Sequence, residues 1–253
     1  MEAAKTPNGA RYGMVVDLDK CNGCGACAVA CAVENNVPPA AERATERNGI
    51  TWLRVHRIEA PGDPRAAFLP MMCQQCGDKT PCASVCPQNA VEVDPASGIV
   101  AQVPVRCLGC RYCMAACPYH ARSFNWWDPD WPGRLTETLN PEVSTRTRGV
   151  VEKCTFCSHR LQAAQDAQAA AGGDAKPPAY TPACAEACPA GAIVFGNLDD
   201  PQSEAARLAQ APGTFRLLER LGTGAKVSYH TERDWVRRLA DGRTAAGDGR
   251  THG

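Results

Sequence analysis

The chain has 253 residues, and its 27 lysines and arginines balance 27 aspartates and glutamates. This length suffices for one large or two medium domains with a buried core, and the balanced charge lacks the basic excess of nucleic-acid-binding proteins. No apolar run approaches the roughly 18 residues that a transmembrane helix needs. We therefore expect neither a nucleic-acid partner nor a membrane span in this chain.

The 16 cysteines are the most informative part of the composition. The first forty residues contain neither the apolar segment of a signal peptide nor a twin arginine, so we expect no export signal. Disulfide-rich scaffolds are small secreted domains, and this chain fits neither property. Metal binding is therefore the better interpretation of the thiols.

In chain order, short apolar or alternating runs between turn-forming residues predict seven strands, at residues 13–18, 50–58, 89–93, 99–103, 121–127, 192–196 and 226–230. Helical patterns lie at residues 28–34, 158–171, 202–210 and 214–221. Strands this short leave little conventional core, so we expect bound metal groups to complete it and the metal-free chain not to fold fully.

The cysteines form four groups of four, and each group ends in a pair with the spacing C-x3-C. Their members, group by group, are Cys21, Cys24, Cys27 and Cys31; Cys73, Cys76, Cys82 and Cys86; Cys107, Cys110, Cys113 and Cys117; and Cys154, Cys157, Cys184 and Cys188. Groups one and three share the spacing C-x2-C-x2-C-x3-C. Group four contains a long insert between its second and third thiols.

This spacing favours iron and sulfur over zinc. Zinc is usually held by two C-x2-C hooks that lie a dozen or more residues apart. Three thiols in C-x2-C-x2-C instead wrap one tight loop around a larger group, and the fourth ligand comes from elsewhere. Pro87, Pro118 and Pro189 follow the last cysteine of groups two, three and four, as in two-cluster ferredoxins, whereas Ala32 takes this place in group one.

With these motifs the chain resembles bacterial ferredoxins. More closely, it resembles the four-cluster iron-sulfur subunits of molybdopterin oxidoreductases of the dimethyl sulfoxide, polysulfide, thiosulfate and tetrathionate reductase type, and those of sulfite-oxidising complexes. The resemblance spans residues 12–230 and rests on the four groups, the insert in group four, and the stretches 124–129 and 149–157.

The resemblance implies an α+β fold of two pseudosymmetric ferredoxin-like dicluster modules with an inserted hairpin, a helix and a C-terminal extension. The implied division is module 1 at 12–35 and 149–200, an inserted hairpin at 36–70, module 2 at 71–130, a partner-facing loop at 131–148, an extension at 201–240 and a disordered tail at 241–253.

The resemblance also implies four [4Fe-4S] clusters, with ligands exchanged between groups one and four and between groups two and three. The implied ligand sets are Cys21, Cys24, Cys27 and Cys188; Cys154, Cys157, Cys184 and Cys31; Cys73, Cys76, Cys82 and Cys117; and Cys107, Cys110, Cys113 and Cys86.

Basic residues recur beside the cysteine groups. Lys20, Arg106 and Lys153 directly precede the first thiol of three groups, and Arg111 lies within group three. Cations near an iron-sulfur cluster stabilise an added electron, so these four are candidates for setting reduction potentials. The alternative is an ordinary solvated side chain.

Three tryptophans, Trp126, Trp127 and Trp131, lie close together after group three. Individually, Trp126 or Trp127 is more simply explained as an apolar cover over a neighbouring cluster. For the loop as a whole we favour contact with a partner, because aromatic residues often anchor interfaces.

The sequence contains no phosphate-binding glycine loop, no HExxH motif and no nucleophile elbow. We therefore expect a non-catalytic subunit that passes single electrons between a molybdopterin catalytic subunit and a multi-span, quinone-binding membrane subunit. Alternatives are a free soluble polyferredoxin and a cysteine-rich zinc module. We expect peripheral attachment to the cytoplasmic membrane through a partner, on the cytoplasmic face by default, with co-export to the periplasmic face as the competing hypothesis.

Overall fold

The computed structural model describes residues 9–45, 48–60, 63–172 and 177–240. The predicted disordered tail at 241–253 lies outside the described residues. Strands and short helices are mixed, in agreement with the α+β prediction. The pseudosymmetry of two modules, and the boundaries between them, stay predictions.

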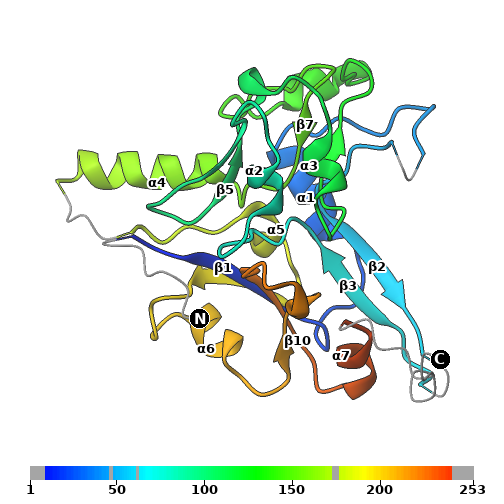
Figure 1. Cartoon of the computed structure of the whole chain (residues 1–253), viewed down its shortest axis with the longest axis vertical. Coiled ribbons are helices and arrows are strands. Elements are labelled where there is room, and N and C mark those ends of the chain that lie inside the picture. Colours follow the sequence, from blue (N-terminus) through cyan, green and yellow to red (C-terminus); the bar gives the residue numbers. More distant parts are fainter. Residues whose placement is uncertain (1–8, 46–47, 61–62, 173–176, 241–253) are drawn as a thin grey trace, which may run out of the picture.

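A four-stranded sheet forms the base of the molecule (Figure 1). Its strands follow one another in the order β8 (Ile193–Asn197), β1 (Tyr12–Asp17), β10 (Val227–His230) and β9 (Thr214–Phe215). Strand β1 is antiparallel to β8 and parallel to β10. All six residues of β1 are buried, which explains its continuous apolar run. The sheet joins chain segments more than 170 residues apart.

Three two-stranded antiparallel sheets complete the strand content of the described residues. They pair β2 (Arg54–Ile58) with β3 (Ala67–Met71), β4 (Val91–Val93) with β5 (Val100–Gln102), and β6 (Ser123–Phe124) with β7 (Val151–Glu152). The hairpin predicted within 36–70 is confirmed, although its first strand begins at Arg54. It extends away from the body, on the side opposite to the projecting helix α4 (Figure 1).

The helices are mostly short and follow the cysteine loops. They are α1 (Ala26–Glu34), α2 (Pro81–Ser84), α3 (Tyr112–Ala115), α4 (Ser158–Ala170), α5 (Ala183–Glu186), α6 (Glu204–Ala209) and α7 (Asp234–Ala240), with 3-10 turns η1 (Pro104–Arg106), η2 (Gly133–Thr138) and η3 (Glu219–Leu221). Helices α1, α2, α3 and α5 each contain the third cysteine of a group. No helix in the described part of the chain is both long and apolar enough to span a membrane.

The helix predicted over 214–221 is wrong. Thr214 and Phe215 form β9, which pairs with β10, and only residues 219–221 make a single 3-10 turn. The ring of Phe215 stacks on that of the fully buried Tyr229, with 5.9 Å between centroids. This pairing with a strand that comes later in the chain outweighs the local helical pattern.

The strand predicted over 121–127 is much shorter in the structure, because only Ser123 and Phe124 form a strand that pairs with β7. The Asn125 N–H still donates to the Val150 carbonyl at 2.9 Å, and the Asn125 side chain donates to the Thr147 carbonyl at 3.2 Å, so the two segments separate only after Asn125. The predicted strands near β1, β4, β5, β8 and β10 and the helices near α1, α4 and α6 are confirmed to within a few residues.

Candidate iron-sulfur sites

Three separate cavities are each lined by four cysteines, of which one comes from a different group of the sequence. Set A comprises Cys21, Cys24, Cys27 and Cys188; set C comprises Cys73, Cys76, Cys82 and Cys117; and set D comprises Cys107, Cys110, Cys113 and Cys86. The remaining four thiols, set B, are Cys31, Cys154, Cys157 and Cys184. All four of set B are buried, and burial followed by the charges on its three companions raises the pKa of Cys31.

Tight left-handed turns bend the loops around these cavities. Gly23 has φ +76°, and a Cβ atom there would lie 2.3 Å from the ring of Phe68. Gly109 in set D has φ +75°, with the Gly149 carbonyl 2.4 Å from the position of a Cβ atom. Glycine is needed at both positions because a larger residue meets both strain and a clash.

Backbone N–H groups point at the sulfur atoms. The Ala90 N–H donates to Cys86 Sγ at 3.2 Å, and the Ala192 N–H donates to Cys188 Sγ at 3.3 Å. Both pairs have the same four-residue spacing after the last cysteine of a group. Four thiols around a closed space, with N–H donors already aimed at sulfur, fit the ligand chemistry of a [4Fe-4S] cluster.

The thiols of the metal-free sites favour the neutral form. Burial raises the pKa of Cys27 and of Cys76 to about 11, and raises that of Cys154 to about 12. The deprotonated thiolate is the form that binds metal. Assembly of the sites must therefore release protons, and bound metal supplies the positive charge that makes buried thiolates stable.

Electrostatic contacts link the cysteine sets in pairs. The charge on Cys27 contributes to the raised pKa of Cys31, which links sets A and B. Burial and then the charge on Cys73 raise the pKa of Cys154, which links B and C. After burial and the effects of Arg122, the charge on Cys82 contributes to the raised pKa of Cys113, which links C and D. These contacts link set A to set B, set B to set C and set C to set D.

Comparison with known proteins identifies the family of this chain. Residues 20–90 and residues 64–131 each match a family described as a 4Fe-4S dicluster domain. The iron-sulfur cluster-binding subunit of a menaquinone reductase from Nitratidesulfovibrio vulgaris is 50% identical over 240 residues, covering 91% of this chain and 92% of that protein. The chain belongs to the iron-sulfur subunits of the molybdopterin oxidoreductases.

Two further relatives are named as subunits of other reductases. The arsenate respiratory reductase iron-sulfur subunit of a Shewanella species is 34% identical over 250 residues, covering 87% of this chain and 95% of that protein. A selenate reductase subunit from Mesobacillus selenatarsenatis is 34% identical over 245 residues, covering 90% of this chain and 75% of that protein. This iron-sulfur subunit is thus a non-catalytic electron-transfer protein. Two dicluster matches and 16 cysteines account for four [4Fe-4S] clusters.

Four cations were predicted to set the reduction potentials of the clusters. Of these four, only Lys153 is deeply buried, at 1% exposure. Its ammonium donates to the carbonyls of Val100 and of Cys154, the latter at 2.8 Å. Lys20 is largely exposed and pairs with Asp17 at 3.4 Å. The tuning role of Lys153 and Lys20 stays a prediction.

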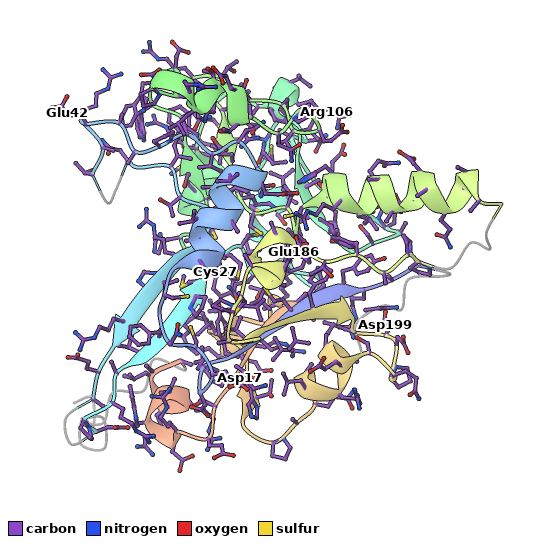
Figure 2. All side chains as sticks on the ribbon, turned by 180° about the vertical axis from the view of Figure 1, so that it is seen from behind. Asp17, Cys27, Glu42, Arg106, Glu186 and Asp199 are labelled. Atoms are coloured by element: carbon purple, nitrogen blue, oxygen red, sulfur yellow. The ribbon has the colours of Figure 1, made fainter. Side chains whose placement is uncertain are left out.

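The other two candidates lie near the surface beside set D. Arg106 pairs with Glu92, and its side chain is 50% exposed. Figure 2 shows Arg106 at the edge of the molecule and, for comparison, the buried Cys27 of set A in the interior. Arg111 lies over the rings of Phe124 and Trp126, at 5.2 and 4.8 Å from their centroids.

Two buried cations beside set C were missed by the sequence analysis. Arg122 is 6% exposed and Lys226 is 2% exposed. Burial lowers the pKa of Lys226 to about 8, and the charges on Cys73 and Cys76 oppose this effect. The position of Arg122, five residues after Cys117, offered a signal, because the equivalent residues of groups two and four are apolar. Lys226 lies far from any cysteine in the sequence, so no sequence signal pointed to it.

The three tryptophans do not form one apolar cover. Trp126 is 39% exposed and packs edge-on against Phe124, with 4.7 Å between centroids. Trp127 lies beneath Arg43, 5.0 Å from its guanidinium, and lines an open groove that includes the acidic side chain of Asp128. Trp131 is half-buried. Among the three, Trp126 is tied most closely to set D, because Arg111 covers its ring.

Proposed function

We propose that the subunit conducts single electrons between two partners docked at opposite ends of its row of cysteine sets. The observation that supports this is the exposure of the thiols. Set A includes the exposed Cys24 and set D includes three half-buried thiols, whereas every thiol of set B is buried. Electrons enter or leave a protein where a redox centre comes near the surface, so A and D are the terminal sites.

Each set A to D is proposed to hold one cluster through four thiolates, with the predicted exchange of ligands between groups. The supporting observation is the mixed origin of the cysteines around the three cavities. The bound clusters supply the one-electron chemistry. The chain supplies the thiolates, the N–H donors to sulfur and an apolar surrounding that excludes water from the interior sets. Phe156, fully buried beside Cys154, is part of that surrounding.

The surface around set D is proposed to dock a quinone-reactive membrane subunit. Exposed apolar and aromatic side chains surround this end: Val105 is 95% exposed, Leu108 57% and Tyr112 65%. Leu108 also lines the cavity of set D. Together with Trp126 they form an apolar rim, which suits a permanent interface. The name of the menaquinone reductase relative favours a quinone-linked partner.

The surface around set A is proposed to dock the molybdopterin catalytic subunit. Cys24 is exposed there, and Val29 on α1 is 66% exposed. The subunit is then held at the membrane through its partner at set D. The cytoplasmic face stays the prediction for its side of the membrane, with co-export as the alternative.

The proposal is tested by purifying the complex and identifying its subunits by mass spectrometry. The double variant Val105→Glu, Tyr112→Glu, at two exposed residues outside the lining of the set D cavity, is expected to lose the membrane subunit while keeping the catalytic subunit and full iron content. Leu239→Glu changes a 43% exposed leucine on α7 and serves as the matched control. A double variant that retains the membrane subunit would reject the docking surface. Wild-type protein that purifies with neither partner would favour the soluble electron carrier.

A further inference from the structure

Arg122 occupies a position that is apolar in two other cysteine groups. After the last cysteine of groups two and four, the pattern Cys-Pro-x-x-Ala is followed by Val91 and Ile193, and in group three it is followed by Arg122. The three side chains are buried to the same degree, at 5%, 6% and 6% exposure. A guanidinium in an apolar position has a high desolvation cost unless opposite charge and acceptors surround it.

The hydrogen-bonding groups of Arg122 are only partly satisfied by the protein. Its Nη2 donates to Oε1 of Gln102, whereas the buried Nε and Nη1 find no acceptor among the described residues. Arg122 lines the cavity of set C, and Gln102 lines the cavity of set D. The free N–H groups therefore lie between two sites that are rich in sulfur.

The thiols of both sets act on this cation. Burial disfavours the charged form, whereas thiolates at Cys82, Cys113, Cys73 and Cys117, the form in which cysteine binds metal, outweigh it and raise the pKa of Arg122. Cys113 belongs to set D, and the other three belong to set C. One guanidinium thus interacts with two neighbouring sites in the row, and it stays protonated.

We propose that Arg122 is a positioning residue that donates its free N–H groups to sulfur at sets C and D and raises the reduction potentials of these two sites. The inference rests on the ligand sets proposed above. Reduction adds one electron, supplied by the neighbouring carrier, and Arg122 keeps its proton throughout. A fixed cation and N–H donors to sulfur stabilise that added negative charge. Both effects favour the reduced state of the sites at sets C and D.

The test is a potentiometric titration, followed by EPR spectroscopy, of the purified complex carrying Arg122→Gln. We expect the potentials of the sites at sets C and D to become more negative, the larger shift being equal to about a tenfold change in the one-electron equilibrium, or 59 mV. Arg106→Gln removes the same charge at a half-exposed position beside Cys107 and is expected to shift potentials by less than half as much. Wild-type potentials in a fully loaded Arg122→Gln complex would overturn the proposal.

Arg122→Lys covers the case in which the glutamine variant binds fewer clusters. Lysine keeps the positive charge but loses the forked set of N–H donors. The reduction potentials of the Arg122→Lys complex are therefore expected to lie between those of the wild-type and Arg122→Gln complexes. If the glutamine variant cannot be measured, the potentials of the lysine variant are expected to lie below those of wild type. Wild-type potentials in the lysine variant would then overturn the donor role. Cys117→Ser separates the ligand sets from the effect of Arg122. It should alter one of the two signals that respond to Arg122, and if it spares both, the ligand sets are wrong although the effect of Arg122 stands.

Discussion

The side-chain amide of Asn35 lies 3.7 Å from the sulfur of Cys157, which is 122 residues later in the chain. The same nitrogen lies 3.9 Å from the sulfur of Cys31 and donates to the Cys31 carbonyl at 2.9 Å. Asn35 ends helix α1, and Cys157 precedes helix α4. One buried amide therefore joins the parts of groups one and four that meet at set B.

Asn35→Leu is expected to lower the reduction potential of the site at set B, because it removes an N–H donor to sulfur and keeps the branched shape of the side chain. A hydrogen bond contributes about 0.5–1.5 kcal/mol, which corresponds to roughly 20–60 mV for a one-electron couple. A redox titration followed by EPR measures the shift. Asn48→Leu, in an exposed loop, is the control. Equal potentials in the two variants would show that the amide does not act on the site.

Cys188→Ser is expected to damage the site built around Cys21, from which it is 167 residues distant in sequence. The reason is the shared cavity of set A, to which Cys188 contributes one of four thiols. EPR and iron analysis should show the loss or conversion of one cluster, at most about four irons. Cys157→Ser should affect a different signal. If both variants remove the same signal, the exchange of ligands between groups is refuted.

Glu152→Ala is expected to destabilise the protein by roughly 3–5 kcal/mol, because it leaves a buried arginine without its counter-charge. The Glu152 carboxylate accepts from Arg146 at 2.9 Å and from the indole N–H of Trp52 at 2.9 Å, and both ionic side chains are at most 6% exposed. Thermal loss of cluster absorbance is the measurement. Glu137→Ala removes an exposed partner of Arg134 and should change stability by less than about 1 kcal/mol. Similar losses in both variants would contradict the importance of burial.

Gly109→Ala is expected to abolish binding at set D, because its Cβ atom would meet the Gly149 carbonyl at 2.4 Å. Gly25→Ala is the matched control, since Gly25 has a similar φ of +79° and no atom within 4 Å of the Cβ position. The control has only the backbone strain, about 1–2 kcal/mol. Iron content per chain distinguishes them. Equal iron loss in both variants would attribute the effect to strain instead of the clash.

The amino-acid sequence by itself determined the family, the cofactor class and the number of clusters. These follow from short-range facts, because three ligands of a cluster lie within one loop and their spacing is visible directly. The helix that carries the third cysteine of group one and the strand that precedes the group could also be read locally. Lys153 is buried beside its cysteine group, in agreement with its position in the sequence.

The family resemblance already implied which cysteine groups meet, but only the tertiary structure decided which cations face them. Residues 214–215 become a strand because β10 offers a pairing edge, and β10 is itself held against β1 more than 200 residues earlier. Lys226 reaches set C through the same pairing. Arg122 and its free donors acquire meaning only when Cys82 and Cys113 approach from two groups. Such contacts depend on the long-range packing of buried segments, which local residue patterns do not encode.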